Sequence, residues 1–189
     1  LAESCRVARR DGFVGRSAFT FLLYGAFSAL RVLAPYVLIV ANGYSGTAAG
    51  AALLPLPIIL TLSSPWTGSL AGRTGARLPI AIGSLVVGAG LLLTLRVRPG
   101  TSYWCGLLPA ILVTSIGLSA AVAPLTTAVL DSADARYMGA ASGFNSATAR
   151  TGSLIATALL GAVLASRGAQ LLASFHVAMI LSAMACFAA

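Results

Sequence analysis

The sequence predicts an all-α integral membrane protein with six transmembrane helices. Of its 189 residues, 58% are hydrophobic and only 8% are charged, whereas soluble domains are about 45–50% apolar and about 25% charged. Long apolar stretches recur along the chain, and a run of about 18 or more apolar residues is typical of a membrane-spanning helix. Only short polar or basic loops separate these stretches, so a soluble fold could not cover its surface with charge.

The arginines assign each loop to one side of the membrane. All twelve basic residues are arginines, and the net charge is +8. The loop at residues 68–77 carries Arg73 and Arg77, and positive residues accumulate in cytoplasmic loops. Alternation from that loop puts seven arginines inside and three outside, namely Arg96, Arg98 and Arg167. We therefore expect a multi-pass protein of the plasma membrane with both ends of this chain in the cytoplasm.

The elements follow in order from the apolar runs. Residues 1–16 are polar and basic, and they predict a cytoplasmic linker or surface helix. A six-helix domain at residues 17–189 follows. The spans are expected at residues 17–41, 47–71, 78–95, 106–130, 139–165 and 169–189. Tyr103 and Trp104, in the external loop before the fourth span, are typical of an interfacial aromatic belt.

Several function classes are disfavoured. The sequence shows no catalytic constellation, phosphate loop or metal-ligand cluster, so we expect no enzyme, no cofactor and no metal. Cys5, Cys105 and Cys186 lie far apart without CxxC spacing, which predicts neither a disulfide framework nor a metal site. The arginines are scattered with few aromatic neighbours, so their charge suits membrane topology and lipid headgroups rather than nucleic acid. The chain starts at Leu1 and stops within an apolar run, and we expect the C-terminal part of a longer protein.

The loop between the second and third spans resembles a motif of the major facilitator transporters. It reads Gly68-x-Leu70-Ala71-x-Arg73-x-Gly75-x-Arg77, close to the family pattern G-x-L-a-D-R-x-G-x-R. Gly72 stands where the family pattern has an acid. An ordinary basic turn that only sets topology is the alternative interpretation of this loop.

Two further stretches are similar to the drug–proton antiporters of that superfamily. Residues 117–130 look like the end of a late helix, and residues 139–152 are similar to the next span, usually A-G-x-A-S-G-x-N-x-x-x-R-x-x-G. The resemblance implies the last six helices of the fourteen-helix branch, built as two inverted three-helix repeats. It further implies export of small amphipathic drugs or metabolites, coupling to protons, and an N-terminal transporter half as partner.

Polar residues of the fifth span recur at helical spacing. Arg150 lies about eleven residues into that span, roughly 16 Å deep, near the centre of a bilayer core of about 30 Å. The polar positions fall on one face that we expect to line a substrate cavity: Ser142, Ser146, Arg150, Ser153 and Thr157. The neighbouring face carries Asn145, Ala149, Gly152 and Ala156, which suit close helix contact; the resemblance adds Asn145 to the site. A clamp on backbone carbonyls is the alternative role for Arg150.

The first span repeats this pattern at Thr20, Tyr24, Ser28, Arg31 and Pro35. Tyr24 and Arg31 are candidate cavity residues, with Arg31 suited to an anionic substrate; a degenerate copy of the family helix is the alternative. Pro35 leaves the carbonyl of Arg31 without its helical donor and allows a bend. Further bending is expected at Pro55, Pro57 and Pro124.

The four acids lie outside the spans, at Glu3, Asp11, Asp131 and Asp134. We expect Asp131 and Asp134 to form a gate with the loop that contains Gly68, Arg73, Gly75 and Arg77. A side chain that carries protons across the membrane must titrate within the membrane. Because none of the four acids lies within a span, the proton carrier is expected outside this chain. His176, the only histidine, is expected to satisfy an ordinary hydrogen bond. A non-transporting membrane scaffold or regulatory half-transporter remains the alternative function.

Overall fold

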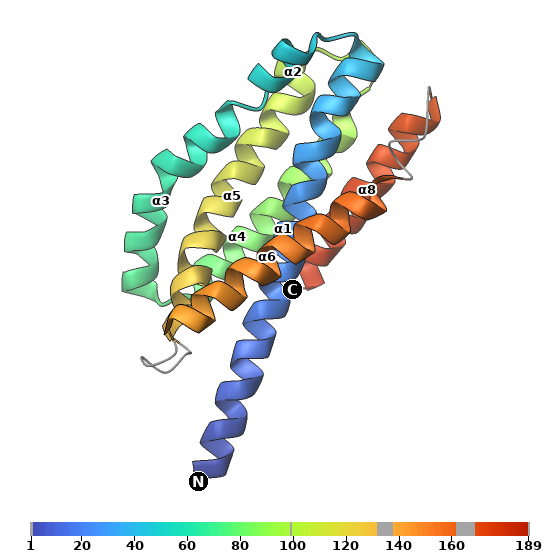
Figure 1. The fold of residues 1–189 in the computed structure, drawn as a ribbon. Helices are drawn as coiled ribbons and strands as arrows, with labels where there is room; N and C mark the ends of the chain where they lie inside the picture. The colour runs from blue at the N-terminus through green and yellow to red at the C-terminus, as the bar shows by residue number, and fades with distance from the viewer. Residues whose placement is uncertain (1, 99, 132–137, 162–168, 189) are drawn as a thin grey trace.

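The computed structural model describes residues 2–98, 100–131, 138–161 and 169–188, and these residues form helices and no strands. Figure 1 shows the arrangement. The helices are α1 (Ala2–Asn42), α2 (Gly46–Ala51), α3 (Pro55–Thr74), α4 (Arg77–Leu93), the 3-10 turn η1 (Thr94–Arg96), α5 (Tyr103–Asp131), α6 (Met138–Leu159) and α8 (Ala169–Ala188).

Five helical stretches are long and apolar enough to cross a membrane. They are Ser17–Asn42, Gly46–Thr74, Arg77–Arg96, Tyr103–Leu125 and Gln170–Phe187. The predicted all-helical membrane character is thus confirmed, whereas the count of six spans is not. α6 is not among the stretches that are apolar enough to cross a membrane, since it contains Arg150, Asn145 and six serines or threonines. The last four residues of the predicted fifth span, 162–165, lie outside the described residues.

Three boundaries differ from the prediction. The basic segment is helical, as one of its two predicted alternatives had it, but it is continuous with the first span, because α1 runs without interruption from Ala2 to Asn42; its first proline is Pro35. The predicted second span is divided into α2 and α3. Tyr103 and Trp104 begin α5 instead of lying in a loop.

Prolines explain the division of the second span. The backbone nitrogens of Pro55 and Pro57 cannot donate to the carbonyls four residues earlier, and Pro55 occupies the first position of α3, where no such donor is needed. Between the two carbonyls that lose a donor, those of Ala51 and Leu53, the carbonyl oxygen of Ala52 accepts a hydrogen bond of 2.7 Å from the Tyr103 hydroxyl. The start of α5 therefore holds the turn between α2 and α3.

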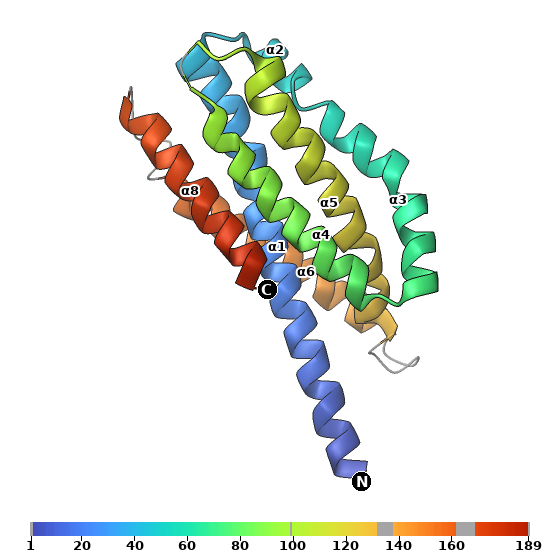
Figure 2. The same ribbon diagram turned by 180° about the vertical axis from the view of Figure 1, so that it is seen from behind.

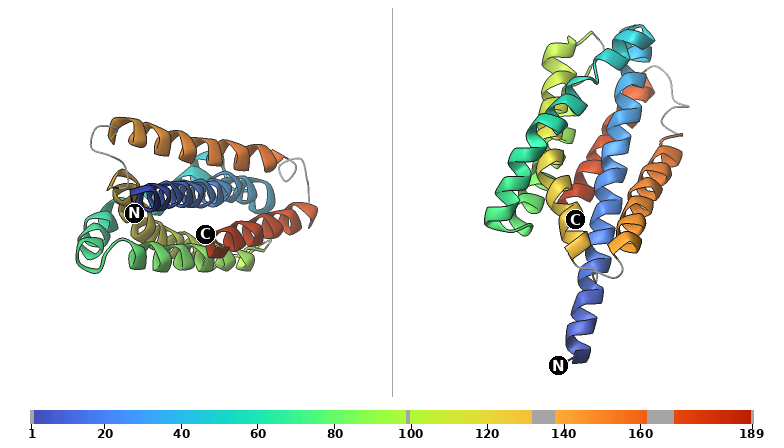
Figure 3. Two further views of the ribbon diagram at one scale, coloured as in Figure 1. Left: turned by 90° about the horizontal axis from the view of Figure 1, so that it is seen from below. Right: turned by 60° about the vertical axis from the view of Figure 1, so that its left-hand side comes forward.

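α1 is the central helix of the bundle. Seen along the bundle in Figure 3, α6 lies on one side of α1 and α4 and α5 lie on the other. Large side chains of α1 and α8 are fully buried there, including Leu30, Leu33, Phe175 and Met179. The core is thus built where α1 meets its neighbours.

α4 and α5 lie side by side on the face shown in Figure 2. Their backbones approach closely because small residues face each other: a Cβ at Gly117 would lie 2.6 Å from the Val87 nitrogen, and one at Gly83 would lie 2.7 Å from the Gly117 oxygen. Small residues allow this kind of packing between membrane helices.

The helix ends alternate between the two ends of the bundle. The turns after α1 and after η1 lie at one end, and the α3–α4 turn lies at the other, near the end of α5 and on the side of the N-terminus (Figure 1). This is the arrangement expected of a chain that crosses a membrane repeatedly.

Candidate functional site

The polar residues of α6 divide into two groups in the structure. Asn145, Ser153 and Thr157 are half-buried, whereas Ser142, Ser146 and Arg150 are exposed. One group meets α1 and the other faces away from the packed bundle. The two groups therefore have different surroundings, although the sequence places them on adjoining faces.

A polar seam joins α6 to α1. The Thr20 hydroxyl donates to Asn145 Oδ1 at 3.1 Å. Ser28 Oγ lies 3.3 Å from the Ser153 carbonyl oxygen and 3.1 Å from Thr157 Oγ1. The Ser153 hydroxyl in turn donates to the Tyr24 carbonyl oxygen at 3.4 Å. Positions predicted to line a cavity from both helices thus bond to one another.

Gly152 allows the backbones of α6 and α1 to approach each other closely at this seam. A Cβ at Gly152 would lie 2.5 Å from the carbonyl oxygen of Phe21, and one at Gly25 would lie 3.4 Å from the carbonyl oxygen of Gly152. The small face predicted for helix contact is therefore the face that meets α1. Such a close approach allows the short hydroxyls of serine and threonine to reach the partner backbone.

Arg150 lies on the other side of α6. Two residues correspond to about 200° of helical rotation, so Arg150 points about 160° away from Gly152. Its side chain is exposed, and among the described residues it has no hydrogen-bond or ion-pair partner. No clamp on a backbone carbonyl is therefore formed within that part of the chain.

Arg31 forms a separate feature on α1. Its side chain is exposed, and its guanidinium carbon lies 5.3 Å from the centre of the Phe27 ring, within the range of a cation–π contact. Because Ser28 pairs with Ser153 and Thr157, Arg31 lies roughly 10–15 Å further along the bundle than Arg150. The two arginines therefore do not share one compact site.

The predicted gate lies partly outside the described residues. Arg73 occupies the last turn of α3, where its charge complements the helix dipole. Gly75 follows with φ of +82°, a conformation that favours glycine, and Arg77 begins α4. Asp131 ends α5, whereas Asp134 is not among the described residues. Gly68 is exposed on α3. The α3–α4 turn lies at the same end of the bundle as the end of α5 (Figure 1).

The predicted bending residues behave differently from one another. Pro55 and Pro57 coincide with the interruption between α2 and α3. Pro35 and Pro124 lie inside continuous helices, α1 and α5. Near Pro124, the Thr67 hydroxyl of α3 reaches the Ser119 carbonyl oxygen of α5 at 3.0 Å.

His176 joins α8 to the end of η1. Its Nε2 lies 3.1 Å from the Val97 carbonyl oxygen, which is the ordinary hydrogen bond expected for a histidine in an apolar helix. No group of metal-ligating side chains occurs among the residues that the structure describes.

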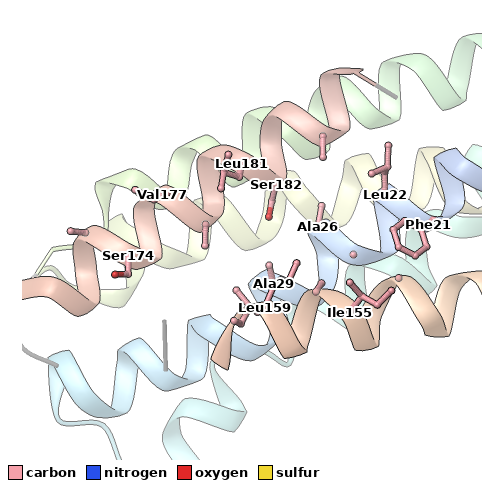
Figure 4. A pocket seen from close by; sticks show the side chains of 17 residues that line it. Phe21, Leu22, Ala26, Ala29, Ile155, Leu159, Ser174, Val177, Leu181 and Ser182 are labelled. Carbon is pink, nitrogen blue, oxygen red and sulfur yellow. The ribbon is translucent and has the colours of Figure 1, made fainter. Parts of the chain in front are cut away.

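Sequence reasoning did not identify a groove between α6 and α8. It has a volume of about 590 Å³, and Figure 4 shows α1 between the helices that form its walls. Its lining is built mainly of alanine, glycine and aliphatic residues. Such residues give no signal in a sequence, because every membrane helix is rich in them.

The chain is similar to several known transporters, although no family model matches it. It is 34% identical over 125 residues, 66% of the chain, to the "Multidrug resistance protein Stp" of Mycobacterium tuberculosis. It is 30% identical over 131 residues, 67% of the chain, to the "Tetracenomycin C resistance and export protein" of Streptomyces glaucescens. It is 31% identical over 118 residues, 60% of the chain, to the "MFS-type transporter lnaF" of Aspergillus flavus.

These matches cover 23%, 23% and 25% of the respective relatives, so the chain spans about a quarter of their length. All three are named as transporters or resistance proteins rather than as enzymes, which fits the absence of a catalytic constellation from the sequence. The similarities, together with the helical membrane architecture, identify the chain as a relative of the MFS-type drug-efflux transporters.

Proposed function

We propose that the chain is part of a secondary transporter that exports small amphipathic drugs or metabolites from the cell. The observation that carries this proposal is the similarity of two thirds of the chain to proteins named for multidrug resistance and for export of tetracenomycin C. A non-transporting scaffold is not favoured, because none of these relatives is named as one.

The proposal extends to the rest of the transporter. The resemblance to drug–proton antiporters supports a fourteen-helix protein of the plasma membrane, in which this chain supplies the last six helices with both ends in the cytoplasm. Substrate paths in such transporters lie between repeats, so the N-terminal half is the proposed partner. Protons are the proposed coupling ion, with the carrier carboxylate in that other half.

The cavity in this proposal is lined by the exposed face of α6. Arg150 supports this role, because an arginine that faced lipid at mid-bilayer would cost at least about 2.5–3.5 kcal/mol on insertion scales. Ser142 and Ser146 lie on the same exposed face. Asn145 and Ser153 of α6, which bond to Thr20 and to the Tyr24 carbonyl oxygen of α1, then act as positioning residues, because these bonds fix the orientation of α6.

The proposal also assigns roles to Arg31 and to the charged residues of the predicted gate. Arg31 forms a second cationic position, separated from Arg150 along the bundle. Arg73 and Arg77 form the cytoplasmic gate with Asp131 and Asp134, in the state of the transporter that faces outward. Exposed ion pairs contribute only about 0–1 kcal/mol, so this gate biases the populations of states rather than the stability of the fold.

The test is drug resistance and export by the complete transporter. Expression in a susceptible bacterial host is expected to lower the accumulation of tetracenomycin C or related drugs, and an uncoupler of the proton gradient should abolish that effect. Arg150→Ala should remove almost all export, while Arg150→Lys should retain part of it because it keeps the charge but loses the planar donor fork.

Arg98→Ala is the matched control, because Arg98 is also exposed but lies in the loop that follows η1. It should leave export unchanged. All rates are normalised to folded protein in the membrane. Export at the normal rate by Arg150→Ala would remove Arg150 from the cavity, and no export of any drug by the unaltered transporter would contradict the proposed function.

A further inference from the structure

The groove between α6 and α8 has three sides. α6 and α8 each pack on α1 but hardly touch each other, so α1 forms the floor and the other two helices form the walls (Figure 4). The floor carries Phe21 and Leu22 at one end and the small residues Gly25, Ala26 and Ala29 beyond them, and Gly152 and Ala156 continue it on α6. The small residues leave the space open.

The groove lies at the depth of the hydrocarbon core. Its α1 residues fall within the stretch Ser17–Asn42 and its α8 residues within Gln170–Phe187, both apolar enough to span a membrane. Its rim carries exposed apolar side chains, with Leu159 74%, Leu181 61% and Val177 55% exposed. No charged residue lines it. Within this chain the groove therefore has an exposed, apolar rim and is suited to a neutral occupant.

The volume of the groove suits a small molecule. At about 590 Å³ it falls within the range of about 300–1,000 Å³ that is typical of sites for drug-sized ligands.

Two hydroxyl groups distinguish the groove from a simple lipid-facing surface. Ser174 and Ser182 line the α8 wall, about 12 Å apart along the helix. Neither hydroxyl has a hydrogen-bond partner among the described residues, although serines in helices often bond to the carbonyl of the preceding turn, as Ser115 does with Ile111. Unpaired hydroxyls in an apolar medium favour a ligand that has polar atoms of its own.

We propose that this groove binds neutral amphipathic molecules of drug size that enter from the bilayer, with their apolar bodies on α1 and α6 and their polar atoms at Ser174 or Ser182. The site is distinct from the cationic face of Arg150, which lies on the other side of α6. The inference rests on the proposed function for its assignment of the ligand as an export substrate. The groove would then collect substrates from the membrane before export.

The experiment measures binding of the neutral dye Nile red to the full chain in lipid nanodiscs. Its fluorescence titration should contain a saturable component that protein-free nanodiscs lack. Ala173→Phe, at an exposed lining position, should weaken this component at least about tenfold. At least one of Ser174→Ala and Ser182→Ala should weaken it about three- to tenfold, as expected for the loss of one hydrogen bond.

Two matched variants serve as controls. Ala89→Phe adds the same bulk at an exposed position of α4, and Ser115→Ala removes a hydroxyl that bonds within its own helix. Both should bind Nile red as the unaltered chain does. Circular dichroism and gel filtration establish whether each variant folds. If Ala173→Phe does not fold, the two serine variants decide the outcome.

Binding that is unchanged in the groove variants would overturn the proposal, and so would the absence of a saturable component, since lipid would then fill the groove. The two proposals fail separately. Drug export that Arg150→Ala abolishes, without Nile red binding, would contradict only the groove. Nile red binding of the expected pattern in a transporter that exports nothing would contradict only the proposed function.

Discussion

Gly152 allows α6 to pack in close contact with α1. A side chain there would have to occupy space 2.5 Å from the Phe21 carbonyl oxygen, and a backbone atom cannot move aside without shifting α1. We expect Gly152→Ala to destabilise the protein by about 1–3 kcal/mol, the usual range for overpacking. Thermal unfolding in detergent, followed by circular dichroism, measures the effect as a lower melting temperature.

Gly143→Ala in the same helix is the control, because nothing lies within 4 Å of the added Cβ. It should be neutral or slightly stabilising, since alanine favours a helix by about 0.5–1 kcal/mol over glycine. Equal melting temperatures for the two variants would mean that α6 and α1 are not in close contact.

The polar residues show how far helical periodicity predicts a site. The spacing of Ser153 and Thr157 on α6, and of Tyr24 and Ser28 on α1, identifies a polar face on each helix. Periodicity cannot tell whether a polar face meets water or another polar face, because that depends on which helices become neighbours. Here the two faces meet each other, and Arg150 is left exposed at the edge of the stripe.

At the scale of elements, the hydroxyl of Tyr103 holds the turn between α2 and α3. It donates to Ala52, whose carbonyl oxygen would accept from Leu56 in an unbroken helix, whereas the Leu56 nitrogen bonds to Leu53. Tyr103→Phe should destabilise the protein by about 1 kcal/mol, the typical contribution of one hydrogen bond. Amide hydrogen exchange should increase mainly at residues 52–58.

Tyr44→Phe is the matched control, since Tyr44 is also half-buried at this end and its hydroxyl has no hydrogen-bond partner among the described residues. It should leave exchange at the turn unchanged. Equal exchange in the two variants would indicate that the prolines alone hold the interruption.

Five of the helical stretches could be predicted from hydropathy because each combines length with low polarity. The interruption at Pro55 was harder to predict, since prolines are often tolerated inside membrane helices, as Pro35 and Pro124 are here. α6 combines Arg150, Asn145 and small polar residues, so its assignment as a membrane span depends on its place in the bundle and on the similarity to transporters rather than on hydropathy.

At the scale of the whole molecule, the alternation of turns between the two ends of the bundle could be predicted, because a chain of successive spanning helices reverses direction at each turn. The groove between α6 and α8 could not, since it exists only because two helices pack on α1 without packing on each other. Its small and aliphatic lining residues are individually indistinguishable from those of any lipid-facing helix.

Orientation in the membrane follows from the same alternation. Thr74 ends α3 and Gly100 precedes α5, and both are exposed. The end of α3 and the start of α5 lie at opposite ends of the bundle (Figure 1). The arginines of the α3–α4 turn predict that this turn lies in the cytoplasm. In a cysteine-free chain within the complete transporter, Thr74→Cys should therefore react with a membrane-impermeant maleimide only after the cells are opened.

Gly100→Cys should react with the same reagent in intact cells, and its labelling controls for access to the cell surface. Gly100 has φ of +78°, so folded yield has to be measured beside labelling; Ser102→Cys, in the same exposed loop, replaces it if the yield falls. The reverse pattern, with position 74 labelled from outside and position 100 protected, would invert the orientation. It would place Arg73 and Arg77 outside the cell and remove the proposed cytoplasmic gate.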